Sequence, residues 1–159
     1  MFTATHLHAM IVHFPIALVL VAFVSELAGF FIQKKFFQQV SLYLLILAAL
    51  GAIAAFLTGD AAGDGMEGGS LHEAMELHEH AAVFTLWFTI AAAGAKIAMV
   101  FLKKEIRWFR IAAFVLLLGA VGGVARTGYL GGQLVFKHAA GVELGLGNFG
   151  TSDDQDNDD

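Results

Sequence analysis

The sequence contains no cysteine, which excludes disulfides, thiolate metal sites and a CxxCH motif for covalent haem attachment. It contains a single proline, Pro15, and only 14% of its 159 residues are charged. Hydrophobic residues make up 58% of the chain, whereas ordinary soluble domains have roughly 45–50% apolar residues. The scarcity of charge and the excess of apolar residues indicate an integral membrane protein.

Apolar runs of the length needed to cross a bilayer, roughly 17–25 residues, account for this composition. They cover about residues 12–32, 40–57, 81–102 and 108–124. Because backbone groups in lipid must find hydrogen-bond partners within their own segment, each run should be an α-helix. Residues 58–71, rich in Gly and Asp, are expected to form a loop. The glycine-containing stretch after residue 124 is expected to return onto the bundle surface.

The predicted fold class is therefore all-α, an integral membrane four-helix bundle. The transmembrane domain is assigned to residues 1–142. The remaining residues, 143–159, include the acidic sequence TSDDQDNDD, which lacks apolar residues and is expected to be disordered.

Basic residues predict the orientation of the bundle in a bacterial inner membrane. They lie in the links after the first and third runs, at Lys34, Lys35, Lys103, Lys104, Arg107 and Arg110. Both links fall on the same side of the membrane, and the positive-inside rule makes that side cytoplasmic. Both termini are then expected in the periplasm.

The seven histidines all fall on the opposite side, near the predicted outer ends of the runs. On the third run, one helical face carries the small or polar residues His78, Ala82, Thr85 and Thr89. The opposite, broader side of this run is aromatic. On the first run, a comparable stripe comprises His6, Met10, His13, Ala17, Leu20 and Val24, and turns away from His8. His13 and His78 are therefore expected to reach inward at similar depth, as in bis-histidine haem ligation within a helical bundle.

Other histidines and charged residues leave alternatives open. His72, Glu76 and Glu79 share a helical face near His80, and this group either binds a non-haem metal such as Zn, Cu or Fe or forms a solvated helix start. Arg126 and Lys137 either pair with haem propionates or extend to the interface.

Two motifs resemble a bacterial family of small four-helix membrane proteins that has long been catalogued as a domain of unknown function. HAMIVHFPIAL is similar to its opening motif HPxxVHFPIAL. GYLGGQLVFKHAAGV is similar to the ending GxLGGxLVYxHGxGV of a subgroup whose members resemble b-type cytochromes. The sequence departs from these patterns at Ala9, Phe136 and Ala139. The histidines of both motifs are unchanged. The resemblance implies functional positions at His8, His13, Pro15, His78, Glu79 and His138.

The predicted function is a membrane-anchored haem b electron-transfer protein on the periplasmic side. His13 and His78 are the first expected axial pair, and His138 with His8 or His72 would hold a second haem. Electrons would pass to or from a c-type cytochrome or a respiratory complex, because histidines on one side alone give no cofactor ladder across the bilayer. No independent enzymatic activity and no nucleic-acid partner are expected, whereas a homo-oligomer is compatible with the sequence. The alternatives are a metal-binding or metal-transport membrane protein and a cofactor-free structural subunit.

Two charges lie deep inside apolar runs. Glu26 lies eight residues before Lys34 and Lys96 lies seven before Lys103, so both sit about 11 Å inside the cytoplasmic boundary. A lone charge at the bilayer centre costs on the order of 2.5–3.5 kcal/mol on insertion scales. The sequence therefore predicts that Glu26 and Lys96 pair across helices.

Reporter fusions test the predicted orientation. A periplasm-active reporter fused after His138 should be active, whereas the same reporter inserted after Lys104 should be inactive, because the basic links favour the cytoplasm. The opposite pattern would move the histidines to the cytoplasmic side.

Overall fold

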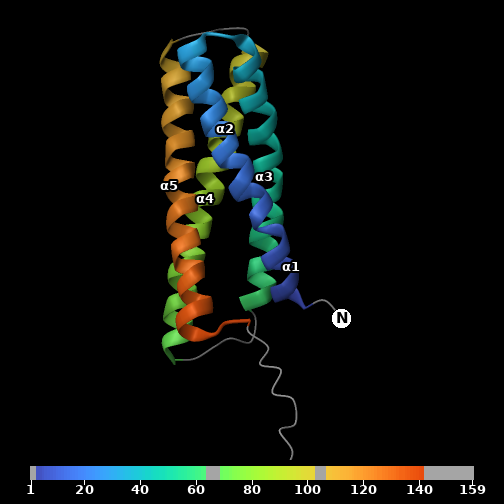
Figure 1. Cartoon of the computed structure of the whole chain (residues 1–159), viewed down its shortest axis with the longest axis vertical. Coiled ribbons are helices and arrows are strands. Elements are labelled where there is room, and N and C mark those ends of the chain that lie inside the picture. Colours follow the sequence, from blue (N-terminus) through green and yellow to red (C-terminus); the bar gives the residue numbers. More distant parts are fainter. Residues whose placement is uncertain (1–2, 64–68, 103–106, 142–159) are drawn as a thin grey trace, which may run out of the picture.

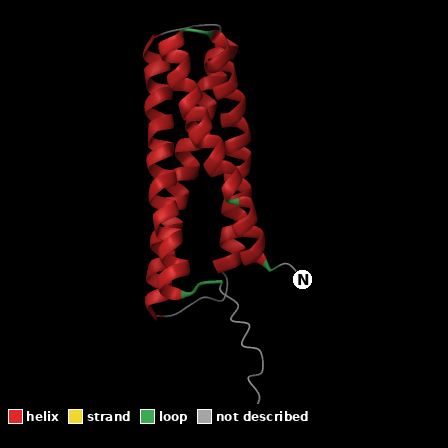
Figure 2. Ribbon diagram, in the orientation of Figure 1, coloured by secondary structure: helices red, strands yellow, loops and turns green. Residues whose placement is uncertain are grey.

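The chain is seen here as a computed structural model that describes residues 3–63, 69–102 and 107–141. These residues form the helices α1 (Ala4–Ile11), α2 (His13–Ile32), α3 (Lys35–Gly63), α4 (Gly69–Leu102) and α5 (Arg107–His138). Helices α1 and α2 together make one interrupted pass, so that four spans are long and apolar enough to cross a membrane. The protein is an all-α four-helix membrane bundle, as predicted (Figures 1 and 2). The predicted tail, residues 143–159, lies outside the described residues.

The helices run alternately up and down, which gives the bundle two chemically different ends (Figure 1). At the basic end, α2 and α4 finish while α3 and α5 begin, next to Lys34, Lys35, Arg107 and Arg110. At the histidine end, α1 and α4 begin while α3 and α5 finish. All seven histidines belong to the halves of the helices nearest this second end, as the sequence predicted.

Three helices are longer than their apolar runs, and two local predictions are therefore wrong. Helix α3 continues to Gly63 and α4 starts at Gly69, which leaves only a short link in place of the loop predicted over residues 58–71. Helix α5 continues to His138, whereas the sequence predicted that the helix ends near residue 124. Hydropathy marks only the part of a helix inside hydrocarbon. Packing against a neighbouring helix, seen in the buried Leu134, outweighs the cost of about 1 kcal/mol that each helical glycine carries.

The core is built mainly from small side chains. Its buried members include Ala22, Ala48, Ala92, Ala93 and Ala120, with Leu45 and Leu117 as the largest fully buried apolar residues. At Gly123 of α5, an added Cβ would lie 2.6 Å from Thr85 Oγ1 and 3.1 Å from Thr85 Cα, so α4 and α5 are in backbone-level contact. Lipid tails are as apolar as leucine, and close approach through small residues is a main source of attraction between membrane helices.

The four spans are not arranged uniformly along the bundle. In Figures 1 and 2 the helix pair α1 and α3 lies apart from the pair α4 and α5 at the histidine end. Helix α1 packs on α3, and α4 packs along α5. The basic half is closed by contacts among α2, α3 and α4, while the histidine end consists of two helix pairs.

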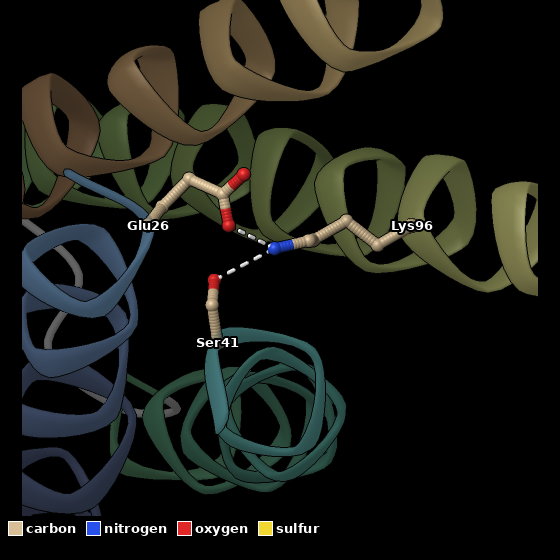
Figure 3. A network of polar contacts seen from close by, with 3 residues as sticks. All are labelled: Glu26, Ser41 and Lys96. Atoms are coloured by element: carbon tan, nitrogen blue, oxygen red, sulfur yellow. Dashed lines mark hydrogen bonds and ion pairs between the residues drawn. The ribbon is translucent and has the colours of Figure 1, made fainter. Parts of the chain in front are cut away.

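A buried polar cluster crosses three helices in the basic half (Figure 3). The Lys96 ammonium of α4 donates to a carboxylate oxygen of Glu26 on α2 and to Ser41 Oγ on α3, the latter at 2.9 Å. Lys96 is 8% exposed and Ser41 is fully buried. The predicted pairing of Glu26 with Lys96 is therefore confirmed, and Ser41 is a partner that the sequence did not reveal.

Substitution of either ionic partner should destabilise the bundle, because it leaves the other charge buried without compensation. Glu26→Gln and Lys96→Met should each lower the free energy of unfolding by about 3–5 kcal/mol, and the double variant should lose less than the sum. Unfolding in mixed detergent micelles measures these losses.

Lys34→Met provides the matched control, because Lys34 is exposed and its substitution should change stability by less than about 0.5 kcal/mol. Strictly additive losses in the double variant would contradict a direct interaction between Glu26 and Lys96.

Candidate functional site

The seven histidines differ in how they are placed within the histidine end. His6, His13, His72 and His80 are exposed, whereas His8, His78 and His138 are partly buried. Among the partly buried ones, His8 and His78 are held by other helices through their rings. This pair, from α1 and α4, defines the candidate site.

His8 is fixed on the surface of α3. Its Nδ1 lies 2.9 Å from the carbonyl oxygen of Ala55 and 3.4 Å from Thr58 Oγ1. A carbonyl oxygen only accepts hydrogen bonds, so Nδ1 carries the proton and Nε2 keeps its lone pair. Gly59 makes room for the ring, since an added Cβ there would lie 2.9 Å from His8 Cε1.

His78 is held against α5 in the same manner. Its Nδ1 lies 3.1 Å from the carbonyl oxygen of Thr127, which again assigns the proton to Nδ1 and the lone pair to Nε2. The Thr127 hydroxyl lies 2.9 Å from Thr85 Oγ1 of α4. Thr85 follows His78 by about two helical turns. An added Cβ at Gly131 would lie 3.1 Å from His78 Cε1. Each imidazole therefore rests on a helical glycine and a backbone carbonyl.

The two rings come from opposite helix pairs, His8 from α1 on α3 and His78 from α4 on α5. Within the described part of the chain, neither Nε2 atom takes part in a hydrogen bond. A metal-ligating histidine almost always donates its other ring N–H to a carboxylate, a carbonyl or water, which fixes the ring and its tautomer. In His8 and His78, the ring N–H is likewise donated to a backbone carbonyl.

The expected inward orientation of His13 is wrong. Its side chain is exposed, and its Nδ1 bonds to the Ala9 carbonyl of the preceding helical turn at 2.7 Å. The whole stripe predicted with it is also exposed or lipid-facing, at His6, Met10, Ala17, Leu20 and Val24. The buried face of this pass is a different one and consists of Pro15, Val19, Ala22, Ser25 and Gly29. His8 lies two helical turns before Pro15 and belongs to that inner face.

On α4, by contrast, the predicted division into faces agrees with the structure. Thr89 is fully buried and Thr85 is partly buried, whereas Trp87 and Phe84 are 63% and 48% exposed. His78 therefore points into the bundle as expected.

The alternative cluster on α4 lies on the surface. His72, Glu76, Glu79 and His80 are exposed, and His72 Nε2 lies 3.6 Å from a Glu76 carboxylate oxygen across one helical turn. Over residues 3–63, 69–102 and 107–141, no group of three or more His, Asp or Glu side chains could hold one metal ion. The structure thus shows a surface contact between two side chains at a position where the sequence also allowed a ligand cage.

The remaining predicted site residues lie near the end of α5. Arg126 is exposed, and Lys137 donates to Gln133 Oε1 on the preceding turn at 3.1 Å. His138 is partly buried and is followed by Ala139, whose φ of 51° ends the helix. These residues are on the same helix as the Thr127 carbonyl and Gly131, but they are not joined to the pair of His8 and His78 by a hydrogen bond in the part of the chain that is described.

Comparison with known proteins gives one family. The family described as "Predicted membrane protein (DUF2231)" matches residues 4–144, which include all the described helices. No curated protein and no solved structure matches the chain.

The glycine beside each ring offers a test of the site that needs no bound group. Gly59→Ala should push His8 away from the Ala55 carbonyl, because the new Cβ would lie 2.9 Å from the ring. Imidazole nitrogen NMR on histidine-labelled protein should then show His8 changing from a single Nδ1–H tautomer to a mixture, while the His78 signals stay unchanged.

Gly122→Ala is the matched control, because an added Cβ at Gly122 meets no atom within 4 Å. This control should leave both imidazole signals unchanged and stabilise the helix by about 0.4–1 kcal/mol. An unchanged His8 signal in Gly59→Ala would contradict the described placement of the ring.

Proposed function

We propose that this chain, which belongs to the DUF2231 family of predicted membrane proteins, holds haem b between His8 and His78 and transfers electrons on the periplasmic side. One observation carries the proposal: two imidazoles from opposite helix pairs each donate Nδ1–H to a backbone carbonyl and keep Nε2 available. Bis-histidine ligation by facing helices of a bundle uses such a pair.

The number of protein ligands favours haem over a bare metal ion. A structural zinc site needs four protein ligands, and a catalytic one needs three. Porphyrin supplies four nitrogen donors of its own, so haem iron requires only two axial ligands from the protein. His8 and His78 satisfy this requirement, while no third His, Asp or Glu joins them among the described residues.

The shape of the surroundings also suits a flat group. Gly59 and Gly131 lie against the two rings, and neither position carries a side chain that would cover an imidazole face. The sequence has no cysteine, so a haem here would be held without covalent attachment. The chemistry that the haem supplies is one-electron transfer at iron, and the two histidines fix its position and its ligand field.

The depth of the site supports electron exchange at a membrane surface. His78 precedes the end of α4 at Leu102 by 24 residues, which is about 36 Å along a helix. The hydrocarbon core is about 30 Å thick, so the pair lies at the level of the headgroups opposite the basic end. The positive-inside rule places the basic end in the cytoplasm and the site at the periplasmic surface of the inner membrane.

A partner must complete the electron path, because the candidate ligands lie at one end of the bundle only. We propose a c-type cytochrome or a subunit of a respiratory complex as this partner. A second haem would require His138 together with His72, since His8 is used by the first site. If the purified protein contains stoichiometric metal without a haem spectrum, the metal-binding function is favoured instead.

Optical spectra of the purified protein test the proposal. After expression with adequate haem supply, reduced-minus-oxidised spectra should show low-spin bands, and acid acetone should extract the pigment. His8→Ala and His78→Ala should each abolish the low-spin spectrum, because each removes one axial ligand.

His6→Ala and His13→Ala are the matched controls and should leave the spectrum unchanged, since both side chains are exposed. A colourless wild-type protein would refute haem binding. Loss of the low-spin bands in His13→Ala, with His8→Ala unaffected, would assign the ligand to His13.

A further inference from the structure

The two proposed ligands are attached to the bundle in very different ways. His78 lies inside the 34-residue helix α4, which packs along α5 at backbone-level contact. His8 lies in α1, an eight-residue helix without a single buried residue. Displacement of His78 would require movement of a long packed helix, whereas displacement of His8 requires movement of a short one.

The junction between α1 and α2 is a weakened turn in an otherwise helical pass, because Val12 keeps helical dihedral angles. Val12 separates the two helices, and Pro15 has no N–H to donate to the carbonyl of Ile11. The next helical bond, from the Ile16 N–H to the Val12 carbonyl, is stretched to 3.5 Å. Pro15 itself is buried, and its ring lies against Gly51 of α3, so α2 is fixed up to this point. Helix α1 therefore extends beyond an anchored pivot.

Helix α1 packs on α3, and two further contacts hold it on the far side of this pivot. The first is the bond from His8 to the Ala55 carbonyl. The second involves Gly141, which follows α5 at a φ of 74° and whose Cα hydrogen points at Thr5. An added Cβ at Gly141 would lie 2.5 Å from Thr5 Cγ2. The turn after α5 thus crosses to α1 and joins the two helix pairs beside the proposed site (Figure 1).

From this asymmetry we propose that His8 is the exchangeable ligand of the site, and that its withdrawal opens a coordination position for a small neutral molecule such as CO or NO. The inference rests on the haem function proposed above. Rotation of α1 near Val12 would carry His8 away from the site as a neutral imidazole and make room for the incoming molecule, while His78 would stay in place. One neutral ligand would replace another, so no electron would be transferred.

The turn after α5 controls this exchange. A residue other than glycine at position 141 would have to adopt a left-handed conformation and would also collide with Thr5. Gly141→Ala should therefore loosen the contact that restrains α1 and speed the departure of His8. Gly122→Ala on α5 is the matched control, because its added methyl group meets no atom within 4 Å.

Carbon monoxide binding to the ferrous protein tests the proposal. In the wild type the rate should reach a plateau at high CO, set by dissociation of His8. Gly141→Ala should raise that plateau by about tenfold, which corresponds to about 1.4 kcal/mol, and Gly122→Ala should not change it. His8→Ala should keep its haem on His78 and bind CO without a plateau, whereas His78→Ala should lose most of its haem.

Equal plateau rates in Gly141→Ala and Gly122→Ala would overturn the role of the turn. A low-spin wild-type spectrum that CO does not change would overturn the exchange and leave the proposed haem function standing. A colourless protein would overturn both.

Hydrogen exchange in the haem-free protein provides a second measurement that does not depend on haem. The amides of residues 4–11 should exchange faster than those of residues 72–82, and Gly141→Ala should accelerate only the former. Equal protection of the two segments would contradict the proposed mobility of α1.

Discussion

The buried Lys96 ammonium is the constraint around which the basic half of the bundle is organised. It lies where water is absent, so its charge must be compensated by side chains from other helices. Glu26 and Ser41 provide this compensation, and the three residues tie α2, α3 and α4 together at one level (Figure 3). A polar contact of this kind specifies which helices meet, which uniformly apolar surfaces in lipid cannot do.

The histidine end follows a different rule because it extends beyond the hydrocarbon core. Water and headgroups can hydrate polar side chains there. The strongest contacts stay within each helix pair, from His8 to α3 and from His78 to α5. Both imidazoles are thus oriented by their own helix pair, while the turn at Gly141 connects the two pairs through its contact with Thr5.

The number and type of helices could be predicted from the sequence because the bilayer leaves so few alternatives. Backbone groups must be satisfied within each span, so an apolar run of sufficient length has to be helical. The cost of a lone charge in the bilayer likewise predicted the pairing of Glu26 with Lys96. The two residues have opposite charges and lie at matching depths, so pairing lowers this cost for both. The ends of α3 and α5 could not be predicted this way, because residues outside hydrocarbon are held by packing that a hydropathy profile does not record. Ser41 gave no signal either, since a serine is tolerated on any face of a membrane helix.

The two histidine-bearing passes show when helical phase is informative in a membrane. On α4 the faces differ in side-chain size, with Thr85 and Thr89 on one side and Trp87 on the other, and the inner face was assigned correctly. The first pass is apolar on every side, so polarity could not separate the face toward lipid from the face toward the core. Size would have done so, because Ala22, Ser25 and Gly29 mark the inner side and small residues let membrane helices approach. That criterion selects His8, two turns before Pro15, and places the candidate ligand on the short helix ahead of the weakened turn. The residue that best fits the site therefore lies on an eight-residue helix, where the Ala55 carbonyl of α3 orients its ring.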